Sequence, residues 1–351
     1  MKLLKLPLYL TWLGSVVWSN SVFPWGERGH DLVTRVAVKQ LDEISQHNPA
    51  LTRPFKLRDH MLSHLSNAPD FYWRSPAMSD AERALNYPTH FIGMETAYPD
   101  QKDLNEFDTS IDYFYQSSSG REIRDPSQIG TAPWRVLQFY KLLTESLATA
   151  RSAKSRDSLI EATNQVLLYA GLMSHFVGDL ANPHHTTENF NGQLTGNTGL
   201  HAYFEDDLVR ELPLALDADI EALAGAELLG KTILSAYPPE EHAAILADPE
   251  KLIFALVFES NSKVDLLHAL DDDFAILKRS TDTRAPAFRR PPREVMHRFR
   301  PFITERIAVG ASVLAQLWKL SWQAATKPNL SSFQSYHYFV TPEFIEPDYL
   351  R

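Results

Sequence analysis

The chain of 351 residues contains no cysteine. This absence excludes disulfide scaffolds, thiol nucleophiles and zinc sites built from sulfur ligands. The sequence also has no glycine-rich phosphate loop and no Gly-x-Ser-x-Gly motif, which are signatures of nucleotide-binding proteins and serine hydrolases. The net charge is −10, and a field of that sign does not attract nucleic acid or an anionic membrane.

Long apolar runs are also absent, except near the N-terminus. Residues 1–24 carry Lys2 and Lys5 and then an apolar run to about Val17, which is typical of a secretory signal peptide. The run is short for a membrane span, and Lys5 interrupts it. We therefore expect a secreted or periplasmic protein with no transmembrane anchor after signal cleavage.

What the chain does have is helical periodicity along most of its length. Apolar positions recur at helical spacing, which predicts an all-α protein. We expect a single catalytic helical domain over residues 25–326 and a C-terminal tail over 327–351. Two polar stretches interrupt the pattern: a long loop insertion over 94–131 and a basic, proline-rich loop over 280–293. The last helix is predicted over about 301–325.

One stretch of the chain concentrates potential metal ligands. Residues 175–205 contain His175, Asp179, His185, His201 and Glu205. The first two and the last two are four residues apart, so each pair shares one face of a helix and can direct two ligand atoms at one metal ion. The helix predicted over about 156–180 is apolar nearly all round, which predicts burial. A bound cation would offset the cost of burying Asp179 there.

Most histidines in proteins are core or surface residues rather than ligands, and the chain has 13. We single out five because they belong to spaced patterns or to the resemblance described next: His30, His90, His175, His185 and His201. The others, including His184 beside His185, are expected to have no metal role.

The segment Trp-Gly-Glu-Arg-Gly-His at residues 25–30 resembles the mature N-terminus of the S1/P1 nuclease and zinc-dependent phospholipase C superfamily. Nine positions match the metal ligands of that family in order: Trp25, His30, Asp70, His90, His175, Asp179, His185, His201 and Glu205. The resemblance covers about residues 25–210. It implies a multi-helix bundle built around a tri-metal site.

By this resemblance, three zinc ions are expected. The first would take Asp70, His90, His175 and Asp179. The second would take His185, His201 and Glu205. The third would take Trp25 through its backbone, together with His30 and Asp179, and it depends on Trp25 becoming the mature N-terminus.

The resemblance also implies catalytic roles for two carboxylates. Asp179 would bridge two metal ions, and Asp70 would orient or deprotonate the attacking water. Zinc ions in such a site hold phosphate oxygens, ionise a water near neutral pH and stabilise the leaving oxygen. The implied reaction is therefore hydrolysis of a phosphodiester.

Members of the superfamily act on different classes of substrate, and the sequence resembles both branches. The five-residue spacing from Trp25 to His30 resembles that of the nucleases. Glu205 and the short segment between His185 and His201 resemble the corresponding features of the phospholipases. A Gly-x-x-Pro-Trp helix start, here 130–134, also resembles the bacterial phospholipase C branch.

Two aromatic residues next to ligands are candidate substrate contacts. Phe71 and Phe91 could face a choline ammonium or a stacked base, although core packing is an ordinary role for either.

We therefore expect a secreted zinc-dependent phosphodiesterase, with phospholipase C as the favoured activity and phospholipid as the substrate. The first alternative is an S1/P1-type nuclease or 3′-nucleotidase acting on single-stranded nucleic acid. The second alternative is a non-catalytic, metal-stabilised helical binding protein. No stable protein partner is expected.

Overall fold

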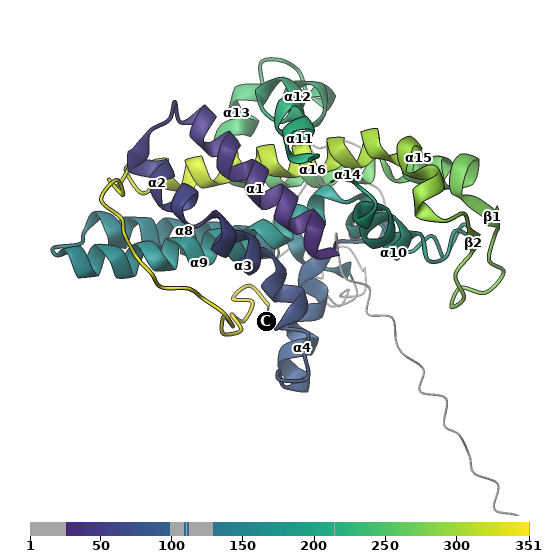
Figure 1. Ribbon diagram of the computed structural model, residues 1–351, viewed down its shortest axis with the longest axis horizontal. Helices are drawn as coiled ribbons and strands as arrows, with labels where there is room; N and C mark the ends of the chain where they lie inside the picture. The colour runs from purple at the N-terminus through teal and green to yellow at the C-terminus, as the bar shows by residue number, and fades with distance from the viewer. Residues whose placement is uncertain (1–25, 99–108, 110, 112–128, 214, 351) are drawn as a thin grey trace, which may run out of the picture.

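A computed structural model describes residues 26–98, 109, 111, 129–213 and 215–350 (Figure 1). The predicted signal peptide, Trp25 and most of the predicted loop 94–131 lie outside the described residues. Within the described part, no helix combines the length and the apolar character that crossing a membrane requires.

The described part of the chain is mostly helical, which confirms the all-α prediction at the level of fold class. The first half contains α1 (Gly26–Ile44), α2 (Pro49–Leu57), α3 (Asp59–Phe71), α4 (Asp80–Asn86), η1 (Tyr87–His90), α5 (Met94–Ala97), α8 (Ala132–Arg151), α9 (Arg156–Ala181) and η3 (Pro183–Thr186). The second half contains α10 (Leu200–Ala202), η4 (Tyr203–Leu208), α11 (Asp217–Leu223), α12 (Ala226–Lys231), η5 (Ile233–Ala236), α13 (His242–Ala247), α14 (Pro249–Asn261), α15 (Val264–Leu270), η6 (Asp271–Ala275), β1 (Ile276–Lys278), β2 (Phe288–Arg289) and α16 (Pro292–Ala324).

The central helix is α9, which packs against α8, α3, α16 and α1. It begins at a capping box formed by Ser155 and Ser158, and every residue from Ala170 to Ala181 is buried. Gly171 lets α3 approach closely, because a Cβ atom at this position would lie 2.6 Å from Leu65 Cβ. The predicted all-round burial is thus confirmed for the second half of this helix, whereas residues 156–161 are exposed or half-buried.

The longest helix, α16, runs across the bundle and packs along α1 (Figure 1). Its predicted start near residue 301 is wrong, because the helix already begins at Pro292. Proline fits the first turn of a helix, where its missing N–H is not needed. Pro301 lies inside α16, where a proline removes one backbone hydrogen bond without ending the helix.

The basic segment 280–293 is only partly a loop, so its prediction as a loop throughout is wrong. β1 pairs with β2 in an antiparallel hairpin that sets Ile276 opposite Arg289. The hairpin is bonded to the segment before α10: the Ser280 amide donates to the Gly196 carbonyl at 2.9 Å, and the Ala287 amide donates to the Thr198 carbonyl at 2.8 Å.

The chain after α16 runs over α2, α3 and α8 without regular structure (Figure 1). The Leu330 amide donates to the Ala50 carbonyl at 2.8 Å. Further along, the Trp73 indole donates to the Pro342 carbonyl at 3.0 Å, and the Gln138 amide donates to the Glu346 carbonyl at 2.7 Å. The tail thus ties together helices from both sides of the bundle core.

Candidate metal centre

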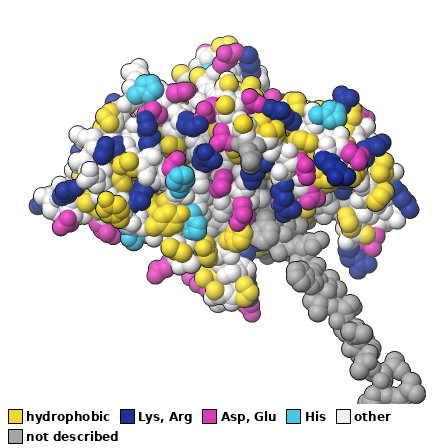
Figure 2. All heavy atoms as spheres, viewed as in Figure 1, with side chains coloured by type: hydrophobic (Ala, Val, Ile, Leu, Met, Phe, Trp, Pro, Cys, Tyr) yellow, Lys and Arg dark blue, Asp and Glu magenta, His cyan; other side chains and the backbone are white. Residues whose placement is uncertain are grey.

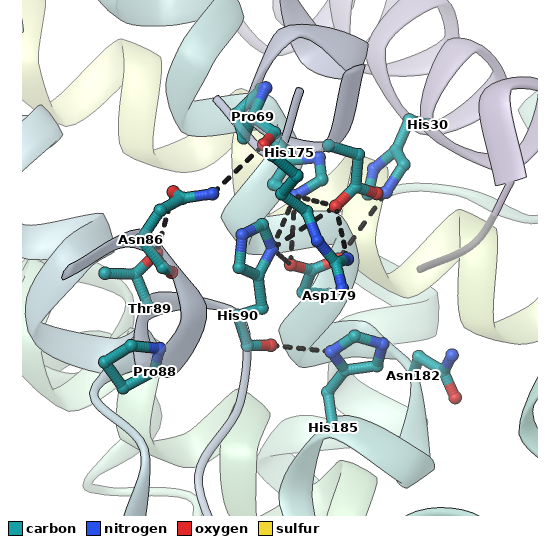
Figure 3. A network of polar contacts seen from close by, with 12 residues as sticks. His30, Pro69, Asn86, Pro88, Thr89, His90, His175, Asp179, Asn182 and His185 are labelled. Carbon is teal, nitrogen blue, oxygen red and sulfur yellow. Dashed lines mark hydrogen bonds and ion pairs between the residues drawn. The ribbon is translucent and has the colours of Figure 1, made fainter. Parts of the chain in front are cut away.

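Candidate ligands from four separate elements meet at one end of α9. His30 comes from α1, Asp70 from the end of α3, and His90 from η1, while His175 and Asp179 lie on α9. All five side chains are buried. Figure 3 shows the three histidines turned toward Asp179.

Asp70, His90, His175 and Asp179 form the first group. His175 Nε2 lies 2.9 Å from His90 Nδ1, 3.2 Å from Asp179 Oδ2 and 3.9 Å from Asp70 Oδ1. Ligand atoms of Asp70, His90 and His175 lie within 4.8 Å of one another, close enough to hold one metal ion.

His30 belongs to a second set that shares Asp179 with the first group. His30 Nε2 lies 3.5 Å from Asp179 Oδ1, and its ring stacks on that of His175 with centroids 4.2 Å apart. His90 and His175 face the other oxygen, Oδ2. The two carboxylate oxygens of Asp179 therefore face different histidines: Oδ1 faces His30, and Oδ2 faces His90 and His175. Trp25, the remaining predicted ligand here, lies outside the described residues.

His185, His201 and Glu205 form a separate group. His201 Nε2 lies 3.1 Å from His185 Nε2 and 2.9 Å from Glu205 Oε2. Glu205 lies on η4, a π-helical turn that follows α10 directly. Single π turns are frequent at functional sites.

The hydrogen bonds of two histidines show that their inward nitrogens are free to bind a cation. His175 Nδ1 bonds to the Ser66 carbonyl at 2.8 Å, and His185 Nδ1 bonds to the His90 carbonyl at 2.6 Å. Since a carbonyl only accepts, each Nδ1 carries a proton, and each Nε2 is the atom that can bind a cation. Both Nε2 atoms face other ligand atoms, which is the arrangement that a metal ion satisfies. The residues present therefore fit metal ions.

The charges of the first group are strongly coupled. Burial raises the pKa of Asp70 to about 6, with His175 and Arg74 acting in the opposite direction. Burial also acts to raise the pKa of Asp179, but the facing histidines, His175 first, hold it well below its usual range. Burial lowers the pKa of His90 to about 3. Asp179 is thus an anion and His90 a neutral base, and these are the forms that bind metals.

His185, which lies 3.5 Å from Glu205, behaves differently. Burial acts to lower the pKa of His185, but the charges of Asp179 and Glu205 outweigh it and raise this pKa to about 9. In the metal-free protein a proton on His185 therefore supplies positive charge between the two carboxylates. A metal ion would displace that proton, so metal binding releases protons here.

Three residues that support these ligands were not predicted from the sequence. Asn182 donates to Glu205 Oε2 at 2.9 Å, and Arg74 donates to Asp70 Oδ1 at 3.0 Å. Asn86 is fully buried and donates to the Pro69 carbonyl at 3.1 Å, so it ties the segment that carries His90 to the end of α3. The only signals in the sequence were proximity to a ligand, for Arg74 and Asn182.

Two stacked aromatic rings, Phe176 and Phe139, pack against the histidines of the first group. The Phe176 ring lies 5.0 Å from that of His175 and 5.5 Å from that of His90, and Phe139 stacks on it at 5.5 Å. The buried guanidinium of Arg135 lies 4.8 Å from the Phe139 ring and donates to the Ile345 carbonyl at 2.5 Å. The C-terminal tail is thereby connected to the metal ligands through packed side chains.

His184, expected to have no metal role, is fully buried beside the group formed by His185, His201 and Glu205. Its ring lies 5.3 Å from that of His201 and 5.8 Å from that of His268. Neither ring nitrogen has a hydrogen-bond partner among the described residues, and burial holds its pKa well below the usual range. It belongs to none of the three groups of ligand atoms found in the described part of the chain.

The two predicted aromatic contacts differ in position. Phe71 is 44 % exposed and lies between two clefts, of about 240 and 480 Å³, whose shared lining also includes Glu27. The smaller cleft reaches Glu205 and Asp206. Phe91 lines neither cleft, and its ring packs on that of Tyr87 at 5.4 Å. A third cavity, of about 460 Å³ along α13 and α14, is lined by none of the candidate ligands.

The described candidate ligands thus form three buried groups that could hold metal ions, two of which share His175 of α9. Comparison with known proteins adds no assignment: no family model matches the chain, and no curated protein matches it.

Proposed function

We propose that the chain is a zinc-dependent phosphodiesterase and that phospholipid is its substrate. The observation that carries the proposal is the position of Asp179, whose two oxygens face different sets of histidines. Imidazole and carboxylate donors without sulfur suit zinc among the common metals. Adjacent metal sites that share a carboxylate are typical of enzymes that cleave phosphate esters.

When bound, zinc ions would bind phosphate oxygens and lower the pKa of a water molecule. The chain itself supplies a candidate proton acceptor. Burial raises the pKa of Asp70 to about 6, close to the range in which a general base works best at neutral pH. Arg74 donates to Asp70 Oδ1 and fixes the direction of the carboxylate. We therefore assign Asp70 the role of orienting and deprotonating water, and Asp179 that of holding two metal ions.

The cleft beside the ligands favours a cationic headgroup. It combines the Phe71 ring with the carboxylate of Glu27. An aromatic face next to negative charge attracts a quaternary ammonium. The two arginines of this cleft are engaged, because Arg28 donates to the Leu212 carbonyl at 2.5 Å and Arg210 pairs with Asp206.

A nuclease is the second candidate, because the half-exposed Phe71 ring also suits a stacked base. Acidic side chains in the cleft count against a long polynucleotide, which needs phosphate contacts along its length. A metal-stabilised binding protein without turnover is the third candidate.

A paired assay on one zinc-loaded preparation tests these candidates. We expect release of phosphocholine or diacylglycerol from phosphatidylcholine and no degradation of single-stranded DNA. Asp179→Asn should abolish the activity and lower the zinc content, whereas Asp207→Asn, an exposed carboxylate outside all three groups, should change neither.

Other results would redirect the assignment. Cleavage of DNA with lipid left intact would establish the nuclease. Zinc bound and required for thermal stability, without activity on either substrate, would favour the binding protein. Full activity in Asp179→Asn would remove the site assignment itself.

A further inference from the structure

Three neighbouring segments expose large apolar side chains at one end of the molecule. We name this surface the hairpin face and define it by Phe190, Leu194, Leu266, Leu277 and Phe288. Their exposed fractions run from 47 % for Phe190 to 68 % for Leu194, with Phe288 at 66 %. Single exposed apolar residues are normal, but a group of them on adjoining segments marks an interaction site.

The segments that carry the hairpin face are fixed to one another. The hairpin is bonded through backbone groups to the segment before α10, as described above. Thr195 Oγ1 lies 3.0 Å from His268 Nδ1 on α15. Beneath them, Arg289 and Asp271 form a buried ion pair at 2.7 Å, and Arg289 also donates to the Thr198 carbonyl at 3.0 Å. The apolar side chains are therefore exposed on a bonded framework.

The charge of the hairpin segment is opposite to that of the whole chain, although Asp271, Asp272 and Asp273 of η6 directly precede it. Residues 276–293 hold six Lys or Arg and one Asp, a net of +5 (6 − 1), in a chain of net charge −10. Arg279 and Arg289 pair with acidic neighbours on η6. Lys278, Arg290 and Arg293 are exposed around Leu277 and Phe288. Figure 2 shows basic and hydrophobic side chains together at the right-hand end, where Figure 1 places the hairpin.

We propose that the hairpin face docks on the surface of an anionic phospholipid bilayer. Leu277 and Phe288 enter the boundary between headgroups and acyl chains, and Lys278, Arg290 and Arg293 contact the headgroup phosphates. Apolar side chains flanked by cations are the combination that binds such interfaces. The leucines favour lipid over nucleic acid, because an aliphatic side chain offers no ring on which a base can stack.

Docking in this position would hold the bilayer against the segment that joins two candidate ligands. The hairpin is bonded to the segment that joins His185 to His201, two ligands of one metal group. The functional role of this docking rests on the proposed function, phospholipid hydrolysis. Docking itself is measured separately, because vesicle binding needs no turnover and a soluble short-chain phospholipid reports turnover without a bilayer.

The test is co-sedimentation of the full-length, zinc-loaded protein with phosphatidylcholine vesicles, with and without phosphatidylglycerol. We expect binding that requires phosphatidylglycerol and weakens with added salt. The double variant Leu277→Ser/Phe288→Ser should lose vesicle affinity by at least about tenfold, because it removes the two inserted side chains. Lys278→Glu/Arg290→Glu should weaken binding similarly. Leu57→Ser, which alters an exposed leucine on α2, is the matched control and should bind as wild type does.

The hairpin variants must keep the wild-type circular dichroism, zinc content and activity on the soluble phospholipid. Wild-type protein that fails to sediment, or hairpin variants that sediment as the control does, would overturn the docking proposal. So would a dimer that the apolar variant dissociates, or single-stranded DNA binding that Phe288→Ser alone abolishes. Vesicle binding with no turnover of the soluble phospholipid would leave docking in place and remove the proposed function.

Discussion

At the scale of single residues, the candidate metal group of His185, His201 and Glu205 is supported by a side chain that is not itself a candidate ligand. Asn182 uses both ends of its amide: its nitrogen donates to Glu205, and its oxygen accepts from the His184 amide at 3.1 Å. It thereby fixes the carboxylate that faces His185 and His201. Such supporting hydrogen bonds commonly change metal affinity by one to two orders of magnitude.

Asn182→Ala removes this support and leaves a buried carboxylate oxygen with one bond fewer. We expect zinc affinity to fall by about 10- to 100-fold, with loss of one zinc per chain in the presence of a competing chelator. Chelator titration with zinc counted by mass spectrometry measures this. Asn329→Ala, on the C-terminal tail, is the control. An unchanged chelation curve would show that Asn182 has no part in the metal group.

Asp31, beside His30 on α1, gives a pH-dependent prediction that does not involve a ligand. Burial raises its pKa from 3.8 to about 6, although Asn67 donates to it at 2.9 Å. The folded protein therefore binds more protons than the unfolded chain between about pH 4 and 6, so this group makes stability fall as pH rises through that window.

Asp31→Asn keeps an acceptor for Asn67 and removes the buried charge. We expect it to stabilise the fold at pH 7 by about 1–2 kcal/mol and to have little effect near pH 4. Urea unfolding at both pH values measures the difference from wild type, which cancels the titration of the metal ligands. A variant that is less stable at pH 7 would contradict this assignment.

The sequence alone predicts only those residue contacts that are local in the chain. His175 and Asp179, like His201 and Glu205, share a helix face because of their spacing. Asp70 and His90 lie far from His175 and Asp179 in the sequence, and only the family resemblance predicted that these four residues meet. Asn86 acts through a backbone carbonyl, a contact that no side-chain pattern reveals.

At the scale of secondary structure elements, the approach of α3 to α9 positions Asp70 beside His175. Gly171 allows this approach. Gly171→Ala places a methyl group against Leu65, and we expect the overpacking to destabilise the fold by about 1–3 kcal/mol and to weaken zinc binding. Thermal unfolding and zinc titration measure both effects.

Gly230→Ala on α12 is the matched control, because no neighbouring atom lies within 4 Å of the added methyl group. This variant should be stabilised by about 0.5–1 kcal/mol through helix propensity. Equal stabilisation by both substitutions would show that α3 and α9 tolerate a wider separation.

The errors in predicted elements also have a physical origin. The last helix is predicted to begin near residue 301, but α16 has Pro291 and Pro292 before and within its first turn and contains Pro301 in its interior. The loop of the hairpin is bonded through Ser280 and Ala287 to the segment before α10, which is distant in the sequence. Local sequence contains neither piece of information.

At the scale of the whole molecule, the C-terminal tail stabilises the region around the metal ligands. Removal of residues 342–351 takes away the carbonyls of Pro342, Ile345 and Glu346 and leaves the Arg135 guanidinium buried without its backbone acceptor. We expect a loss of about 3–5 kcal/mol, as for other buried charges that lose a partner, together with weaker zinc binding.

Chemical unfolding of the truncated chain measures the loss, and removal of Leu350 and Arg351 alone serves as the control. Addition of a peptide that spans residues 342–351 should restore part of the stability. A truncated chain with wild-type stability would show that the Arg135 charge finds another acceptor.

The hydrogen bond from His185 Nδ1 to the His90 carbonyl joins two candidate metal groups, because each partner is itself a candidate ligand. A metal ion bound by His90 would hold that carbonyl still, and the carbonyl would hold His185 in the tautomer that metal binding requires. We therefore expect that filling of one group would favour filling of the other. With scarce zinc, native mass spectra should show chains that carry a full complement beside chains that carry none, with few in between. The protein would then respond to its zinc supply as a switch, with the fraction of competent molecules set by the metal available.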